Sequence, residues 1–169
     1  MNLNEEKYLI EIMDKMEKIQ YGWIDINNEI HINTIKDLQK LYRLADIKEI
    51  IENKIGICFD QVELERFYFQ DRFQTQSYAI TSTHMIHTFL ALQSDNDYIY
   101  FEHSSAKLKG IYYFNNMNQL LEFAIEQYMF RHKIKKTSNV KLIPYNKLEK
   151  GTTFNDILNI LKENDLKHI

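Results

Sequence analysis

Several residue types are scarce in this chain of 169 residues, and each scarcity excludes a class of protein. The single cysteine, Cys58, rules out an internal disulfide bond. One proline and four glycines are too few for the many tight turns of a β-sandwich or barrel. No apolar run approaches the roughly 18 residues of a membrane-spanning helix, and the acidic N-terminus lacks the apolar core of a signal peptide. We therefore expect a cytoplasmic protein that does not enter a membrane.

An excess of charge of one sign is also lacking. The 21 Lys and Arg residues and 24 Asp and Glu residues give a net charge of -3. The one basic cluster, at residues 131–136, lies at the end of a predicted helix, where cations offset the helix dipole. Without a long basic run to neutralise phosphates, a nucleic-acid partner is not expected. A hydrophobic content of 44% indicates a folded protein with a real core.

The periodicity of apolar residues predicts an α+β fold in a single domain over residues 1–169, with helical residues 1–53, a core over 54–132, and a C-terminal strand and helix over 138–169. Helices are predicted over 4–19, with Asn4 as N-cap, from Thr34 through Tyr42, over 45–53, 58–71 and 117–132, and from Thr152 or Thr153 onward. Extended segments are predicted over 24–32, 77–82, from His84 or Met85 to Gln93, and over 97–103, 111–114 and 140–143.

The chemistry centres on Cys58, which follows Gly56 and begins a predicted helix. A thiol at a helix N-terminus lies in the positive field of the helix dipole, which favours the thiolate. Backbone N–H groups that are free at the same end can donate hydrogen bonds to an oxyanion. The alternative is a buried and inert thiol, because cysteine is among the most buried residue types.

His87 and Glu102 complete a triad if their two predicted strands form a hairpin closed at residues 94–97. In that register Gln93 pairs with Tyr98, and Glu102 becomes the diagonal neighbour of His87 on the same face. The imidazole can then take the thiol proton while the carboxylate orients the ring. A satisfied core histidine and a solvated glutamate are the alternatives.

Further residues near the triad have both a functional and a structural interpretation. Trp23, the only tryptophan, either covers the cleft or anchors the N-terminal helix in the core. Asp60 and Ser104 are candidates to line the cleft. Glu65 and Arg66 either line the site or form a solvated face, and the latter is favoured because surface pairs are the rule.

Other histidines offer alternatives to His87. In unbroken strands His84 and His103 face away from His87 and Glu102, respectively. The remaining histidines have no comparable partner nearby in sequence: His31, His132 and His168. Because the faces alternate, a zinc site built from His84, His87, Glu102 or His103 is awkward. We expect neither a metal nor a cofactor.

Three segments carry a resemblance to a known family. The segments Gly56-Ile57-Cys58-Phe59-Asp60, His87-Thr88-Phe89 and Tyr98-Ile99-Tyr100-Phe101-Glu102 resemble the transglutaminase-like superfamily over about residues 50–115. The resemblance implies a papain-like core with Cys58 as nucleophile, His87 as base and Glu102 as orienting acid. The chain departs from the family pattern at Glu102, where Asp is usual, and in the residues that follow it.

These features predict a cysteine-dependent hydrolase or acyltransferase that acts on an amide or ester through a thioester. The expected substrate is a peptide or a small amide or ester. The alternative is a non-catalytic binding module on the same fold with a vestigial site, because the family includes inactive relatives. Neither the particular substrate nor the oligomeric state follows from the residues.

Overall fold

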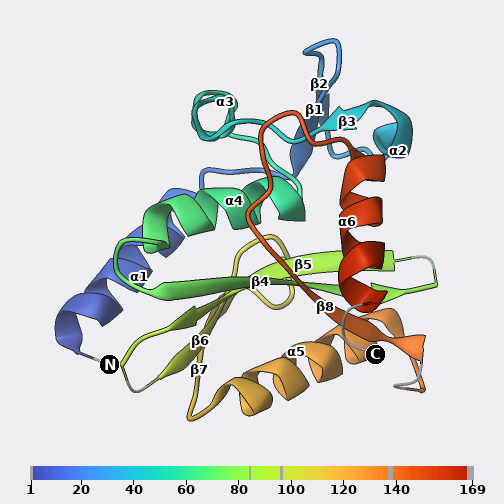
Figure 1. Cartoon of the computed structure of the whole chain (residues 1–169). Coiled ribbons are helices and arrows are strands. Elements are labelled where there is room, and N and C mark those ends of the chain that lie inside the picture. Colours follow the sequence, from blue (N-terminus) through green and yellow to red (C-terminus); the bar gives the residue numbers. More distant parts are fainter. Residues whose placement is uncertain (1, 84, 96, 137–138, 167–169) are drawn as a thin grey trace.

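A computed structural model of the chain describes residues 2–83, 85–95, 97–136 and 139–166 (Figure 1). These residues form an α+β fold with six helices and a five-stranded antiparallel sheet. A second, three-stranded sheet lies beside them. The predicted fold class is therefore confirmed at the level of secondary structure and its order.

The helices are α1 (Leu3–Met16), α2 (Leu38–Leu41), α3 (Ile47–Asn53), α4 (Cys58–Phe69), α5 (Met117–His132) and α6 (Phe154–Leu166). The large sheet contains β4 (Gln74–Ser82), β5 (Met85–Gln93), β6 (Tyr98–Glu102), β7 (Gly110–Phe114) and β8 (Lys141–Tyr145). The small sheet contains β1 (Gly22–Asp25), β2 (Ile30–Ile32) and β3 (Tyr42–Arg43).

Two predicted helix starts differ from the structure. Helix α1 is capped by Asn2, whose side chain accepts hydrogen bonds from two backbone N–H groups, one of them that of Asn4, the predicted cap. Helix α2 begins after Asp37, which adopts a left-handed conformation with φ 61°, and it is not capped by Thr34. Tyr42, predicted to be helical, already belongs to β3. Short segments rich in polar residues have competing caps, which moves helix ends by a few residues.

The large sheet has the strand order β7-β6-β5-β4-β8, and all neighbours are antiparallel. The predicted hairpin register is confirmed, because Gln93 pairs with Tyr98 and the ladder continues to Leu90 paired with Phe101. A slip of one residue would have moved Glu102 to the other face of the sheet. The register therefore positions the strand ends that carry His87 and Glu102.

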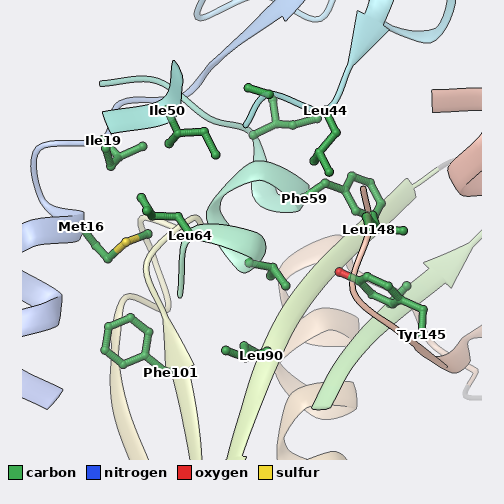
Figure 2. Packing of buried hydrophobic residues seen from close by; sticks show 14 of the residues in the cluster. Met16, Ile19, Leu44, Ile50, Phe59, Leu64, Leu90, Phe101, Tyr145 and Leu148 are labelled. Carbon is green, nitrogen blue, oxygen red and sulfur yellow. The ribbon is translucent and has the colours of Figure 1, made fainter. Parts of the chain in front are cut away.

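Helices cover both faces of this sheet (Figure 1). Helices α1 and α4 lie on one face and α5 lies on the other. Alternation along β5 follows this arrangement, since Leu90 packs in the cluster with α4 and Phe89 packs in the cluster with α5. Figure 2 shows the first cluster, in which Phe59 of α4 lies beside Leu148 and Tyr145. Each such side chain contributes about 1.5–3 kcal/mol when it is fully buried.

Helix α4 is buried on nearly every side, because it contacts α1, α3, β4 and β5. Arg66 forms a local ion pair within the helix, with its Nε 3.1 Å from Glu63 Oε2. The expectation that Glu65 and Arg66 form a solvated face is wrong, since their exposed fractions are 2% and 8%. Surface statistics do not apply to a helix that is enclosed by other elements.

The described helices include none whose length and apolar character would let it cross a membrane.

Candidate active site

Cys58 is the first residue of α4, and two neighbours hold the chain there. The carboxylate of Asp60 accepts the backbone N–H of Ile57 at 3.0 Å and that of Ala45 at 3.1 Å. A Cβ atom on Gly56 would lie 2.9 Å from the Cβ of Asp60, so this position requires glycine. Asp60 thus caps the helix and ties it to the preceding segment, and the Cys58 side chain is half-buried at its N-terminus.

Burial affects the capping carboxylate itself. Asp60 is 1% exposed, and desolvation raises its pKa to about 7, against the lowering effect of the N–H groups of Ala45 and Ile57. Asp60 was expected to line a cleft. The structure gives it a role inside the protein, where it shapes the start of α4.

His87 and Glu102 form a short hydrogen bond at the ends of β5 and β6. The distance between His87 Nε2 and Glu102 Oε2 is 2.7 Å, and the side chains are 9% and 2% exposed. Burial lowers the pKa of His87, but the charge of Glu102 and hydrogen bonding with Cys58 and Glu102 raise it overall. The raised pKa favours the imidazolium form of His87, which the Glu102 carboxylate holds through this hydrogen bond.

Glu102 receives four hydrogen bonds, an unusually complete set for one buried carboxylate. Besides His87, the hydroxyls of Tyr100 and Ser104 donate to it at 2.9 and 2.8 Å, and the backbone N–H of Ser105 donates at 2.9 Å. Burial raises its pKa, but the charge of His87 and these donors lower it overall. Glu102 stays ionised and fixes the imidazole. Ser104, predicted to line the cleft, thereby orients the carboxylate.

His87 and Glu102 lie beyond the paired residues of β5 and β6. The paired ladder of β5 with β6 ends at Leu90 and Phe101, so His87 and Glu102 lie beyond its last rung. By alternation His87 shares the face of Phe89, which α5 covers. On that helix, burial, then the charge of Arg131, and then the charge of His87 lower the pKa of His132. His87 also interacts with the thiol of Cys58 on α4. Only the β5–β6 ladder ends here, since β5 remains paired with β4 at His87.

Glu65 is a second buried carboxyl group near the triad. It lies seven residues after Cys58 on α4, which places both on a similar helix face. Its side chain makes no hydrogen bond with the described residues. Desolvation, followed by the charge of Glu102, raises its pKa well above the ordinary value. Burial therefore favours the neutral form of the Glu65 carboxyl group.

Trp23 lies in the core and not over the triad. Its side chain is 1% exposed, its Nε1 donates to the carbonyl oxygen of Thr34 at 2.8 Å, and its ring stacks on His31 at 4.0 Å. This is the anchoring position that the sequence left as the alternative. None of these contacts involves Cys58, His87 or Glu102.

The other histidines divide into three groups. His103 Nδ1 lies 2.8 Å from Oε1 of Gln61 on α4. His31 forms, with Asp25 and Glu29, the one group among the described residues whose ligand atoms all lie within the 4.8 Å required to hold a metal. The Asp25 carboxylate already accepts hydrogen bonds from the backbone N–H groups of Asn27 and Glu29. It therefore stabilises the turn that follows β1. His84 and His168 lie outside the described residues.

Sequence reasoning missed several contributors that signals in the chain could have indicated. Tyr100 lies two residues before Glu102 and therefore on the same strand face. Gln61 lies one turn after Cys58. The contact of Gln61 with His103 joins residues 42 positions apart and has no local signature.

Comparisons with family models, curated proteins and solved structures gave no match to this chain.

Proposed function

We propose that this protein is a cysteine-dependent hydrolase or acyltransferase. The single observation that carries the proposal is that a fully hydrogen-bonded Glu102 holds the buried imidazole of His87, whose pKa the Cys58 thiol helps to raise. A nucleophile, a base and a group that orients the base are the three parts of such a site. The resemblance to the transglutaminase-like superfamily and its papain-like core supports the same chemistry.

The proposed reaction begins with the Cys58 thiolate and the His87 imidazolium. The sulfur attacks the carbonyl carbon of an amide or ester, and an S–C bond forms while the bond to the leaving group breaks. The His87 imidazolium gives its proton to the leaving group and becomes neutral. Water or an amine then attacks the thioester and returns a proton to His87 as the thiolate leaves. The backbone N–H of Cys58 is the donor proposed for the oxyanion.

Acylation of Cys58 tests this function. Wild-type protein, Cys58→Ala and His87→Ala are mixed with p-nitrophenyl acetate, and release of nitrophenolate and intact mass are followed. We expect an acetyl group on the wild-type chain alone, with a burst of nitrophenolate. Cys58 is the only cysteine, which makes its modification unambiguous. An unmodified wild-type chain would contradict the proposal.

A binding module is the second candidate, favoured by a specific surface. Apolar side chains are exposed around the β1–β2 hairpin and the segment after it: Ile26 at 52%, Ile30 at 48%, Ile32 at 47% and Ile35 at 72%. Exposed apolar groups that lie together are typical of protein contacts. The binding module predicts that Cys58 reacts with iodoacetamide no faster than a free thiol, whereas the enzyme predicts rapid alkylation below about pH 8.

A further inference from the structure

The β1–β2 hairpin carries three side chains of the types that bind metal ions: Asp25, Glu29 and His31. Figure 1 shows this hairpin projecting from the rest of the molecule. His31 pairs with Trp23 in the β1–β2 ladder. The backbone N–H of Asp25 donates to the carbonyl oxygen of Glu29 at 3.0 Å, which continues the same ladder. Because residues two apart along a strand point to one face, the three side chains share the face of Trp23.

The turn at the end of the hairpin fixes the Asp25 carboxylate. Its Oδ1 accepts hydrogen bonds from the backbone N–H groups of Asn27 at 2.7 Å and Glu29 at 2.8 Å. Asn28 completes the turn in a left-handed conformation with φ 66°, and its side-chain oxygen accepts a hydrogen bond from Arg43 at 2.7 Å. The second oxygen of Asp25, Oδ2, takes no part in this turn. One carboxylate oxygen therefore has a set position and points toward the other two side chains.

The imidazole of His31 is also held in place. Its ring stacks on the indole of Trp23, with ring centroids 4.0 Å apart and an angle of 12° between the planes. The indole itself is buried, and its Nε1 donates to the carbonyl oxygen of Thr34 at 2.8 Å. Two of the three side chains are thus fixed by contacts outside their own group, while Glu29 is exposed and approaches from the solvent side.

The distances within the group fit a bound cation. Nε2 of His31 lies 3.2 Å from Oδ2 of Asp25, whereas a charge-assisted hydrogen bond is usually about 2.7–2.9 Å long. A tetrahedral zinc ion with bonds of about 2.0–2.2 Å separates two ligand atoms by about 3.4 Å. The three ligand atoms all lie within 4.8 Å of one another. Since Asp25 is only 1% exposed, a cation here would also pair with a carboxylate that is covered from water.

We propose that Asp25, Glu29 and His31 bind a divalent transition-metal cation of the zinc type. One imidazole nitrogen and two carboxylate oxygens are donors that zinc accepts, and a fourth position is left for water. Calcium and magnesium prefer sets made of oxygen donors alone. A bound ion joins the two strands across their turn and so stabilises the hairpin. The inference does not depend on the proposed chemistry at Cys58.

Zinc binding is measured on untagged Cys58→Ala protein, because the thiol of Cys58, the only cysteine, is a second zinc ligand of this chain. Zinc chloride is added while the heat of binding and the tryptophan emission are followed. Trp23 is the only tryptophan and stacks on His31, so its emission reports on this site. We expect one zinc ion per chain, a saturable change in emission, and no displacement of zinc by calcium at the same concentration.

Three substitutions each remove one ligand and keep the local structure. In Asp25→Asn the amide oxygen still accepts the two N–H groups of the turn, and an NH₂ group replaces Oδ2. In His31→Phe the ring still stacks on Trp23 but has no nitrogen. Glu29→Gln changes an exposed side chain, so it is not expected to affect folding. His132→Gln, on α5, is the control for loss of a histidine elsewhere.

Each of the three substitutions should weaken zinc binding by about a hundredfold, because loss of even an outer partner of a metal ligand costs about 10–100-fold. The control should bind zinc like the Cys58→Ala parent. Unchanged affinity in Asp25→Asn, His31→Phe or Glu29→Gln would overturn the three-ligand site. Absence of zinc binding by the parent, or displacement of zinc by calcium, would overturn it as well.

Discussion

Replacing Glu102 with Gln should destabilise the fold and remove the activation of Cys58. The amide keeps the shape of the side chain, and its oxygen can still accept from Ser104 and Ser105. Its NH₂ group, however, faces the hydroxyl of Tyr100 and the Nε2 of His87, which both donate to Glu102. Breaking a buried ion pair costs about 3–5 kcal/mol, and we expect about 3 because the imidazole can lose its charge.

The loss should depend on pH with a defined sign. The pKa of Glu102 is lowered by folding, so its contribution is present above the unfolded value of about 4.3 and is lost as pH falls through the folded value. The pKa of His87 is raised, so its contribution is complete below about pH 6.5 and declines as pH rises through the folded value. The destabilisation by Glu102→Gln should therefore be largest at about pH 5–6.

Urea denaturation at about pH 5.5 and at about pH 8.5 measures this difference, and iodoacetamide alkylation of Cys58 measures the loss of activation. Glu63→Gln is the matched control, because Glu63 is an equally buried carboxylate on α4 that pairs with Arg66 and accepts the N–H of Leu148. The control should also lower stability, but it should keep the wild-type dependence of alkylation on pH. If Cys58 in Glu102→Gln is alkylated with the wild-type dependence on pH, the carboxylate does not act on the thiol through His87.

Three further substitutions test the surroundings of the triad. In the wild type, the folded chain keeps a proton on Glu65 that the unfolded chain releases, so stability should decline by about 1.4 kcal/mol per pH unit above about pH 4.5. Glu65→Gln should remove this decline. If the wild-type and Glu65→Gln stabilities from urea denaturation run parallel from acidic to neutral pH, the expectation is wrong. Gly56→Ala should cost about 1–3 kcal/mol in thermal unfolding, because its Cβ would meet the Cβ of Asp60, and unchanged stability would contradict the close approach. Asp60→Asn should cost a similar amount, because one of two backbone N–H groups loses its acceptor, and amide exchange at Ile57 or Ala45 should become faster.

The elements that could be predicted from the sequence are those with strong local signals. The alternation along β5 and the turn after Gln93 set a register that the structure confirms, because a slip would turn every side chain of the strand over. The start of α4 at Cys58 followed from Gly56 and the apolar periodicity after it. These same local signals place Cys58 at the start of α4 and His87 and Glu102 on neighbouring strands.

Other features depend on tertiary contacts that have no local trace. Glu65 carries a charge in the sequence, and only the enclosure of α4 by α1, α3 and the sheet makes it a buried neutral acid. Trp23 fits the core and the edge of a cleft equally well by composition, and its stacking on His31 across the β1–β2 ladder decides between them. Caps such as Asn2 compete with polar neighbours over energies of about 1 kcal/mol, which is too little for a pattern to resolve.

Four buried titratable groups on or near α4 fit the proposed cysteine chemistry better than a role in stability alone. Asp60, Glu65, His87 and Glu102 all lie at or near the thiol end of α4 with exposed fractions of 7% or less. Replacing such groups with apolar side chains of similar volume is often neutral or stabilising in proteins. A core that served folding alone would therefore gain little from four titratable groups, one of which has no hydrogen bond with the described residues. The charge of Cys58 contributes to the pKa shifts of both Glu65 and His87, and this half-buried thiol is the group that would react with a substrate in the proposed function.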